Sequence, residues 1–348
     1  MSRITMAHGA GGQMMHQLVK DYVLTYLGGS GAEVPLEALD DAAVIEGIVL
    51  KSDSHTVKPL FFPGGDIGRL AIAGTVNDIA VMGAAPQALT SGFILEEGFP
   101  LLDFERILRS MRATCREAGV HVITGDTKVV ERGAIDQVMI NTSGIGRRTE
   151  ALDQNIAEVK KHRPFSSRWL LDSNLQAGDR LLVSGTMGDH GIALLSFREG
   201  YDFGCSIQSD VAPLNVLIQE VLEVGGVVAL KDPTRGGLAN ALNEWSDKSR
   251  VGIMVEEAQI PVREGVRAAC EMLGIEALEI GNEGKVVVGV VPEKAMDVLA
   301  AMRNMEAGRD AALIGEVTDA FDGVVMETQV GGKRFLPPPL GDPIPRIC

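Results

Sequence analysis

Cys348 is the first candidate for a reactive residue in this sequence, because its thiol stands at the end of a proline-rich segment. Residues 336–348 contain five prolines, and proline fixes φ and lacks a backbone N–H donor. The segment is therefore predicted to run as a stiff, solvated arm of roughly 40 Å. Such an arm could carry the thiol into a distant cleft, where the thiolate is the reactive form. A frayed chain end is the alternative.

Acidic residues stand at several predicted strand and helix positions. Asp41 precedes a strand predicted over residues 44–51, and Asp53 follows it, so both could be surface turn residues. Asp78 falls on the apolar stripe of a helix predicted over residues 67–82. A carboxylate there must be paired, hydrogen-bonded or bound to a cation, because an unpaired buried charge costs several kcal/mol.

The same predicted helix carries two further polar groups. Asp66 is expected to cap its N terminus, and Asn77 aligns with Asp66 on one helix face. One face of the helix therefore carries more polar groups than a core-facing helix needs.

Four more charged residues stand where strands or turns end. Asp126 and Lys128 lie in a Gly-Asp-Thr-Lys turn after a strand predicted over residues 120–123. Asp232 precedes a proline and a glycine pair that lead into a helix, and Glu283 lies on a tight turn. Active sites often form at strand-end loops, although a solvated turn explains each residue equally well.

A glycine-rich segment precedes the first predicted helix, residues 14–26. It contains His8, Gly9, Gly11 and Gly12. Glycines before a helix expose backbone N–H groups at its positive end, which is a common phosphate-binding device. A flexible leader is equally consistent with this segment, and the chain has no Walker A sequence.

The elements that would position these residues are alternating strands and helices. The alternation is interrupted between Arg147 and Gly178 by a stretch that contains a charged run, and it resumes at a strand predicted over residues 179–184. The interruption is predicted to be an interdomain linker with one short helix. A length of 348 residues and an apolar content of 45% also suggest two domains.

The composition argues against several classes of protein. The formal net charge is −15, so the surface is expected to repel nucleic acid and anionic membranes. No segment approaches the ~18 apolar residues of a membrane helix. The four cysteines are widely spaced, which argues against a zinc site or a disulfide framework and favours a reducing cytoplasm. Cys115, Cys205 and Cys270 are expected to pack in the interior.

Together these motifs resemble the HypE family of hydrogenase maturation proteins, within the AIR synthetase-like ATP-binding superfamily. The matching residues are 8–12, 40–43, 65–69, 77–84, 125–128, 188–191, 232–239 and 345–348. The aspartate motifs are shared across the superfamily, whereas the terminal Pro-Arg-Ile-Cys is specific to the family. The basic stretch at residues 147–178 is longer than the family pattern.

The resemblance implies a two-domain α+β (mixed α/β) fold with an extended tail. Residues 1–148 would form an N-terminal ATP-binding domain that dimerises through its sheet, with ATP at or near the dimer interface. Residues 149–177 would be the linker and residues 178–335 a C-terminal α+β domain. Residues 336–348 would be a mobile tail that ends in the reactive cysteine.

The resemblance further implies an ATP-dependent carbamoyl dehydratase that acts on its own terminal cysteine. The carbamoyltransferase HypF would carbamoylate Cys348, and dehydration would convert the thiocarboxamide to a thiocyanate. The nitrile group would pass to iron in a HypC–HypD complex for the NiFe hydrogenase centre. Glu283 is the expected base that removes the amide protons, and Lys128 is expected to stabilise phosphate charge or assist proton transfer.

Two sets of binding residues follow from the same resemblance. The expected ATP-binding residues are His8, Gly9, Gly11, Gly12, Asp66, Asn77, Asp78 and Asp126. The expected Mg²⁺ ligands are Asp41, Asp53, Asp78, Asp126 and Asp232, because Mg²⁺ prefers oxygen ligands.

Two other functions remain open at this stage. Another phosphoryl-transfer enzyme of the superfamily would share the aspartate motifs, but selenophosphate synthetases carry a reactive cysteine or selenocysteine near the N terminus, where this chain has neither. A non-enzymatic scaffold could instead dock its proline-rich tail on a partner.

Overall fold

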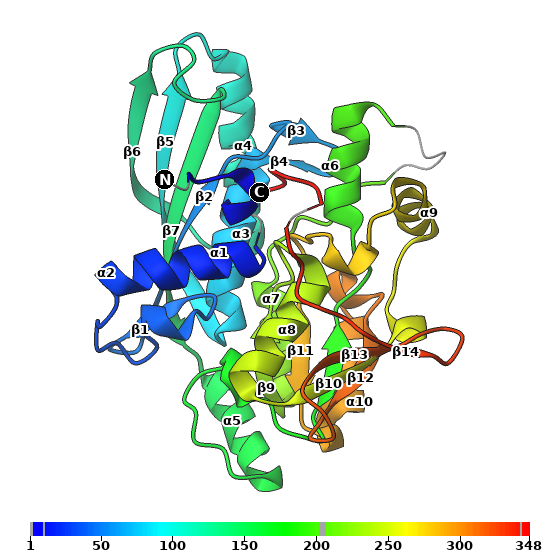
Figure 1. The fold of residues 1–348 in the computed structure, drawn as a ribbon. Helices are drawn as coiled ribbons and strands as arrows, with labels where there is room; N and C mark the ends of the chain where they lie inside the picture. The colour runs from blue at the N-terminus through cyan, green and yellow to red at the C-terminus, as the bar shows by residue number, and fades with distance from the viewer. Residues whose placement is uncertain (1–2, 10, 202–206, 342) are drawn as a thin grey trace.

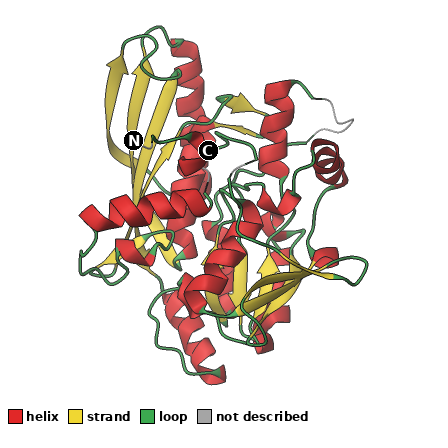
Figure 2. Ribbon diagram, in the orientation of Figure 1, coloured by secondary structure: helices red, strands yellow, loops and turns green. Residues whose placement is uncertain are grey.

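The computed structural model describes residues 3–9, 11–201, 207–341 and 343–348, so Ala10 and Cys205 lie outside the described residues. Figure 1 shows two bodies packed against each other, each built on one sheet, and Figure 2 shows the helices arranged around these sheets. No described helix is both long enough and apolar enough to cross a membrane. The predicted mixed α/β fold in two domains is confirmed.

The N-terminal body is built on a five-stranded mixed sheet. In spatial order its strands are β1 (Ala43–Ile45), β2 (Ile48–His55), β7 (Val138–Arg148), β5 (Ala84–Glu96) and β6 (Val122–Val130). Helices α3 (Ile67–Val81) and α4 (Leu101–Ala118) pack on the sheet, and the short pair β3 (Phe61–Phe62) and β4 (Gly65–Asp66) leads into α3.

Helix α3 lies where the sequence predicts it and is buried on nearly every side. Asp66 caps it as predicted, since its Oδ1 accepts the backbone N–H groups of Gly68 at 2.8 Å and Arg69 at 3.0 Å. One side of α3 packs on the N-terminal sheet, and another contacts helix α7 and strand β9 of the second body. A carboxylate on this helix is therefore held in the interior of the molecule.

Strand β6 forms an edge of the N-terminal sheet and is exposed along most of its length. Its apolar side chains include Ile123 and Val129, each 67% exposed. An edge strand with exposed apolar side chains is a ready surface for another chain.

The C-terminal body is built on a seven-stranded mixed sheet. In spatial order its strands are β14 (Lys333–Phe335), β13 (Gly323–Glu327), β10 (Gly252–Glu256), β12 (Ala312–Thr318), β8 (Arg180–Val183), β11 (Val287–Val290) and β9 (Val227–Lys231). Its helices are α6 (Asp189–Glu199), α7 (Asn215–Val224), α8 (Gly237–Ser249), α9 (Glu264–Leu273) and α10 (Ala295–Arg303). Glu283 lies in the connection that leads into β11.

The segment predicted as a linker is part of the packed interior. It carries α5 (Glu150–His162), whose Thr149 cap accepts the N–H of Leu152 at 3.0 Å. Leu152 and Trp169 are buried in the hydrophobic core that joins the two bodies. The charged run at the end of α5 is solvent-facing as expected, but the apolar residues around it fix the segment in place.

The N-terminal helix and the tail both differ from their simplest prediction. The first helix runs through α1 (Gln13–Leu18), a π-helical turn (Val19–Leu24) and α2 (Thr25–Leu27), and buries no side chain.

The tail is not a solvated arm, because Ile344 and Ile347 are buried and it runs along the junction of the two bodies (Figure 1). Its two isoleucines supply the apolar burial that the proline pattern does not reveal.

Candidate active site

A cavity of about 690 Å³ lies where the two bodies meet. The glycine-rich segment, β2, α3, the loop after β9 and the turn at Glu283 all contribute to its lining, and so does Cys348. Residues that are far apart in the sequence therefore line one cavity.

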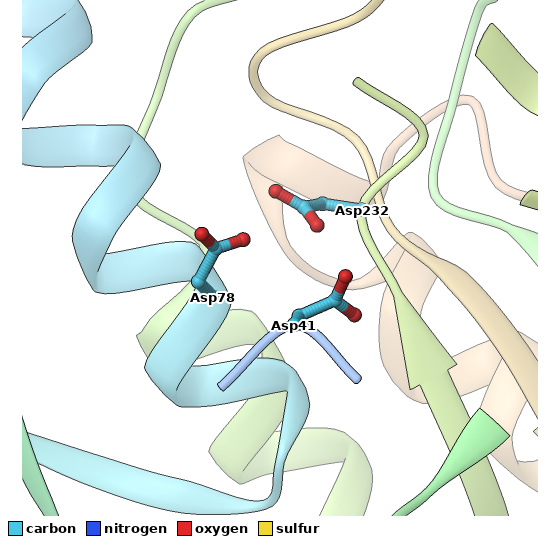
Figure 3. Close-up of side chains that lie close together, drawn as sticks. All are labelled: Asp41, Asp78 and Asp232. Atoms are coloured by element: carbon cyan, nitrogen blue, oxygen red, sulfur yellow. The ribbon is translucent and has the colours of Figure 1, made fainter. Parts of the chain in front are cut away.

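Three of the five predicted metal ligands converge in this cavity. Asp41 stands just before β1, Asp78 on α3 and Asp232 directly after β9. Each offers a carboxylate oxygen, and these oxygens all lie within 4.8 Å of one another (Figure 3). The structure therefore assembles an acidic cluster from three separate elements.

The electrostatics of this cluster fit a bound divalent cation. Burial raises the pKa of Asp41 and raises the pKa of Asp78 well above its usual value. Burial, with the Asp41 carboxylate, raises the pKa of Asp232 to about 7. Three buried carboxylates at this spacing repel one another, and hard oxygen donors are the ligands that Mg²⁺ prefers. The donor set therefore suits Mg²⁺.

Two lysines that the sequence analysis missed contact the cluster. The Lys51 ammonium lies 2.6 Å from Asp78 Oδ2 and 3.3 Å from Asp53 Oδ1. The Lys231 ammonium lies 2.9 Å from Asp41 Oδ1. Lys51 could have been recognised, because residues two apart on a strand share a face and Lys51 stands two before Asp53.

Lys231 is charged despite its burial. Burial alone would lower its pKa, but the carboxylates of Asp172, Asp41 and Glu244 raise it well above the usual value. Its ammonium lies 3.0 Å from both Asp172 and Glu244. The acidic cluster is thus joined to the interior of the linker segment through one lysine.

Asp53 lines the cavity beside the cluster. Its Oδ2 accepts the Thr75 hydroxyl at 3.2 Å, and its backbone carbonyl accepts Asn141 Nδ2 at 2.7 Å. It does not belong to the group of three converging carboxylates.

Glu283 is a buried carboxyl in the same cavity and not a solvated turn residue. Its Oε1 has no hydrogen-bond partner among the described residues. Burial, with the Asp232 and Asp210 carboxylates, raises its pKa well above the usual value. The backbone N–H of Glu283 donates to Asp210 Oδ1 at 3.0 Å, which fixes the turn. A carboxyl with a raised pKa is suited to accept a proton near neutral pH.

Asp66 and Asn77 have structural partners and do not line the cavity. Asp66 caps α3. Asn77 Nδ2 donates to the carbonyl of Ala212 at 3.1 Å, and its Oδ1 accepts the N–H of Leu214 at 2.8 Å. The ATP-binding role expected for these two residues has no direct support in this geometry, because Asp66 is used to cap α3 and Asn77 to hold the second body against α3.

The glycine-rich segment reaches the cavity through Gly11 and Gly12. Gly11 has φ +79° and packs against Arg235, and a side chain at Gly12 would collide with the carbonyl of Pro339. His8 lies in a 3-10 turn outside the cavity lining, as Gly9 does. The two later glycines therefore have a steric reason for their identity.

Cys348 lies in the cavity with the acidic cluster and Glu283. Its backbone carbonyl accepts the N–H of Thr56 at 3.2 Å. The negative charge of Cys348 is the main cause that raises the pKa of Arg235, which also lines the cavity. Arg235 is a further functional candidate, which lies within the motif at residues 232–239.

Asp126 and Lys128 also lie outside the cavity of their own chain. Both are exposed on β6, where the Lys128 ammonium lies 2.7 Å from Asp126 Oδ2. Hydrogen bonding to Lys128 lowers the pKa of Asp126. Their expected roles in ATP and metal binding, and in catalysis, stay predictions.

Comparison with known proteins identifies the family. Residues 39–148 match the N-terminal domain, and residues 176–327 the C-terminal domain, of AIR synthase related proteins. The chain is 46% identical to the carbamoyl dehydratase HypE of Azotobacter vinelandii, over 99% of this chain and 97% of that protein. It is 44% identical to the carbamoyl dehydratase HypE of Escherichia coli, over the full length of both.

This chain belongs to the HypE family.

Solved structures of the HypE family share its fold. The HypE chain of a HypE–HypF complex has a TM-score of 0.84 and 45% identity, over 92% of this chain and 99% of that one. A HypE structure in complex with ATP has a TM-score of 0.79 and 41% identity, over 99% and 100%. The motifs by which the sequence resembles the HypE family, at residues 40–43, 77–84, 232–239 and 345–348, all contribute to the cavity described above.

Proposed function

We propose that this chain is an ATP-dependent carbamoyl dehydratase whose substrate is its own carbamoylated Cys348, and that it supplies the cyanide ligands of a NiFe hydrogenase iron centre. The observation that carries the proposal is the presence of Cys348 in one cavity with the acidic cluster and Glu283. The HypE relatives named carbamoyl dehydratases and the ATP-bound HypE structure support it.

The reaction removes one oxygen and two protons from the thiocarboxamide S–C(=O)–NH2. The amide oxygen attacks the γ-phosphorus of ATP, which releases ADP and makes that oxygen part of a phosphate leaving group. One N–H proton is lost as the phosphorylated imidate forms, and the second is lost when the C–O bond breaks. The products are the thiocyanate S–C≡N, ADP and phosphate. Phosphoryl transfer of this kind depends mainly on positioning and charge neutralisation.

The acidic cluster would hold Mg²⁺, through Asp41, Asp78 and Asp232, with Asp53 nearby. When bound, the ion supplies positive charge for the phosphate oxygens. Lys51, Lys231 and Arg235 add fixed positive charge around the cavity of an otherwise acidic protein. Gly11 and Gly12 would let the N-terminal segment approach the phosphates closely.

Glu283 would accept the amide protons. Its raised pKa follows from burial, which makes it a stronger base than an exposed glutamate once it is ionised. The turn that carries it is fixed by Asp210, so the carboxyl is held in place without reorganisation. Lys128 would then stabilise the charge that develops on the phosphate.

A homodimer would explain why Lys128 and Asp126 lie outside their own chain's cavity. Both stand on the exposed edge strand β6, whose apolar side chains a second copy would cover. We propose that β6 of one copy contributes Lys128 to the cavity of the other, with ATP near the interface. The N-terminal domain would then span residues 1–148 and the C-terminal domain residues 178–335.

The partners proposed for this chain follow from the chemistry before and after dehydration. A carbamoyltransferase, HypF, would load the thiol, and the solved HypE–HypF complex supports this assignment. A HypC–HypD complex would take the nitrile group to iron. Both steps require residues 336–348 to leave the cavity, so the docked tail would be one of at least two positions of a mobile segment.

Intact-mass spectrometry tests the proposal directly. The purified chain with HypF, carbamoyl phosphate and ATP should first gain a carbamoyl group on the terminal peptide and then lose one water in an ATP-dependent step. An unchanged terminal peptide would overturn the proposal. A superfamily kinase would instead phosphorylate a separate small molecule, and a scaffold would show no ATP turnover.

A further inference from the structure

The last five residues of the tail are bound by a set of residues that we call the tail groove. These residues are Thr56, Lys58, Asp136, His190 and Arg198. The N–H of Thr56 donates to the carbonyl of Cys348 at 3.2 Å, and the N–H of Lys58 donates to the carbonyl of Arg346 at 3.1 Å. These two bonds pair the backbone of the tail with the segment that follows β2, although neither segment is a regular strand. Main-chain pairing of this kind is one of the recurring ways in which proteins bind extended peptides.

The groove also recognises the Arg346 side chain. Its Nη1 donates to Asp136 Oδ2 at 2.8 Å, and its Nε and Nη2 donate to the carbonyl of Thr56 at 3.1 and 2.9 Å. Lys58 shares the same carboxylate at 2.9 Å. Arg346 has φ +59°, a conformation that costs free energy in a non-glycine residue and persists where the surrounding contacts fix it.

Two apolar sockets flank this arginine. Ile344 and Ile347 are fully buried, and a side chain on Gly281 would lie 2.6 Å from the Ile347 Cδ1 atom. Backbone carbonyls between and beside the sockets are also bound. His190 Nε2 donates to the carbonyl of Ile347 at 2.8 Å, and Arg198 Nη1 donates to that of Pro345 at 2.8 Å.

The connector before this recognition segment makes fewer buried contacts. Pro337, Pro338 and Leu340 are exposed, whereas Leu336 and Pro339 are buried. The side chains that are specifically bound therefore lie in residues 344–348, and residues 336–343 mainly tether them to the C-terminal body. A tether raises local concentration without adding recognition, typically to about the millimolar range.

We propose that the groove is a peptide-binding site that accepts a carbamoylated Ile-Pro-Arg-Ile-Cys end in trans, so that the cavity can dehydrate a tail supplied by another molecule. This inference rests on the proposed dehydratase function. The step has the same balance as the reaction in cis: the amide oxygen leaves in phosphate, ATP becomes ADP, both N–H protons are lost and the peptide gains a thiocyanate.

A test must first weaken the competing tail of the recipient chain. The full-length Arg346→Glu/Cys348→Ala chain places a glutamate opposite Asp136 and carries no thiol on its own tail. The probe is a synthetic peptide of residues 340–348 with an N-terminal fluorophore, prepared with a free or an S-carbamoylated cysteine. Fluorescence anisotropy measures binding without chemistry, and mass spectrometry of the peptide with ATP and Mg²⁺ measures dehydration.

We expect saturable binding of the peptide and ATP-dependent loss of water from its carbamoylated form. A peptide with glutamate at the Arg346 position should bind about fivefold more weakly, because it loses a charge-assisted pair and faces Asp136. The full-length Asp136→Arg chain supplies a matched control and a second recipient. It repels the arginine of its own tail, and it should prefer the glutamate peptide.

Two results would overturn the inference. One is the absence of saturable binding, or binding that does not respond to the charge exchange, in both recipients. The other is binding without dehydration in trans while the wild-type chain dehydrates its own tail. Failure of the wild-type chain on its own carbamoylated tail would instead contradict the proposed function, and peptide binding would still report on the groove.

Discussion

The surroundings of Glu283 differ from those of an ordinary, solvated glutamate. It is buried, it faces the carboxylates of Asp232 and Asp210, and its Oε1 lacks a hydrogen-bond partner among the described residues. Such an environment is costly for stability, so its retention fits a group used in chemistry.

Replacement of Glu283 by glutamine should block the dehydration step but leave carbamoylation of the tail unaffected. The amide keeps the shape of the side chain but cannot accept a proton at neutral pH, and general bases typically contribute 10²–10⁴-fold. We expect the dehydration rate to fall at least about 100-fold, measured as accumulation of the carbamoylated mass. Glu279→Gln, a partly exposed carboxyl outside this cavity, is the control and should retain activity. Normal thiocyanate formation in Glu283→Gln would remove Glu283 from the mechanism.

His55 should make the stability of the protein depend on pH. Burial lowers its pKa to about 4, so the imidazole is neutral in the folded state, whereas the unfolded chain binds a proton below about pH 6.5. The contribution of His55 to stability should therefore be fully present above pH 6.5 and be lost, by up to about 3 kcal/mol, as the pH falls toward 4. Urea unfolding of wild type and His55→Gln at pH 7.5 and 5 checks this, and equal pH slopes in both would contradict it.

Sequence patterns revealed some site residues and not others, for a physical reason. Asp78 was found because its helical spacing placed a charge on an apolar stripe. The partners of the cluster were not, because Lys231 and Asp41 are separated by 190 positions and meet only through packing of the two bodies. Asp66 and Asn77 have structural roles that the motif does not reveal, since polar residues in a matching motif can serve a cap or a loop as well as a ligand. Their expected part in ATP binding stays a prediction.

At the scale of elements, the spacing of apolar residues predicted where helices and strands form but not what they pack against. The helix predicted over residues 67–82 is α3 (Ile67–Val81), and the strand predicted over residues 179–184 is β8 (Arg180–Val183). Two predictions at strand ends were wrong. The predicted turn with Asp126 and Lys128 lies within β6 (Val122–Val130), and Asp53 lies within β2 (Ile48–His55) instead of after its strand. The segment with α5 was predicted as a linker because its charges dominate the pattern. This segment is attached to the C-terminal body through Asp172, which pairs with Lys231 of β9 and Lys248 of α8. These partners are distant in the sequence, so no local pattern could predict the pairing.

Loss of Asp172 should therefore cost far more stability than a residue in a linker would. Its carboxylate binds Lys231 at 3.0 Å, Lys248 at 2.7 Å and the Trp245 indole N–H at 2.7 Å. Asp172→Ala removes the carboxylate that the two lysines share and leaves the Trp245 N–H without its partner, so we expect the free energy of unfolding to fall by about 3–5 kcal/mol. Asp153→Ala, an exposed partner of Arg148, should cost less than about 1 kcal/mol. Similar urea midpoints for the two variants would contradict a buried network.

At the scale of the whole molecule, a dimer in which β6 completes the partner's cavity makes a distinctive prediction for mixed variants. Lys128→Ala and Glu283→Ala should each be inactive alone. Dimers that contain one copy of each would have one intact site, provided that Lys128 acts across the interface. Random exchange of subunits should then restore about a quarter of wild-type activity, measured as thiocyanate formed on the Lys128→Ala chain. Native mass spectrometry should confirm that the subunits have exchanged. If activity is still not restored, Lys128 acts in the site of its own chain or takes no part in the mechanism.

The burial of α3 has a consequence for how the protein unfolds. Thirteen of the residues of α3 are buried, and the helix packs on the sheet of the N-terminal body while it contacts α7 and β9 of the other. Water cannot reach its backbone amides unless the two bodies separate, so these amides should be among the slowest to exchange hydrogen for deuterium. The two bodies should consequently melt as one cooperative unit, and calorimetry should show a single heat-absorption peak where two independent domains would give two.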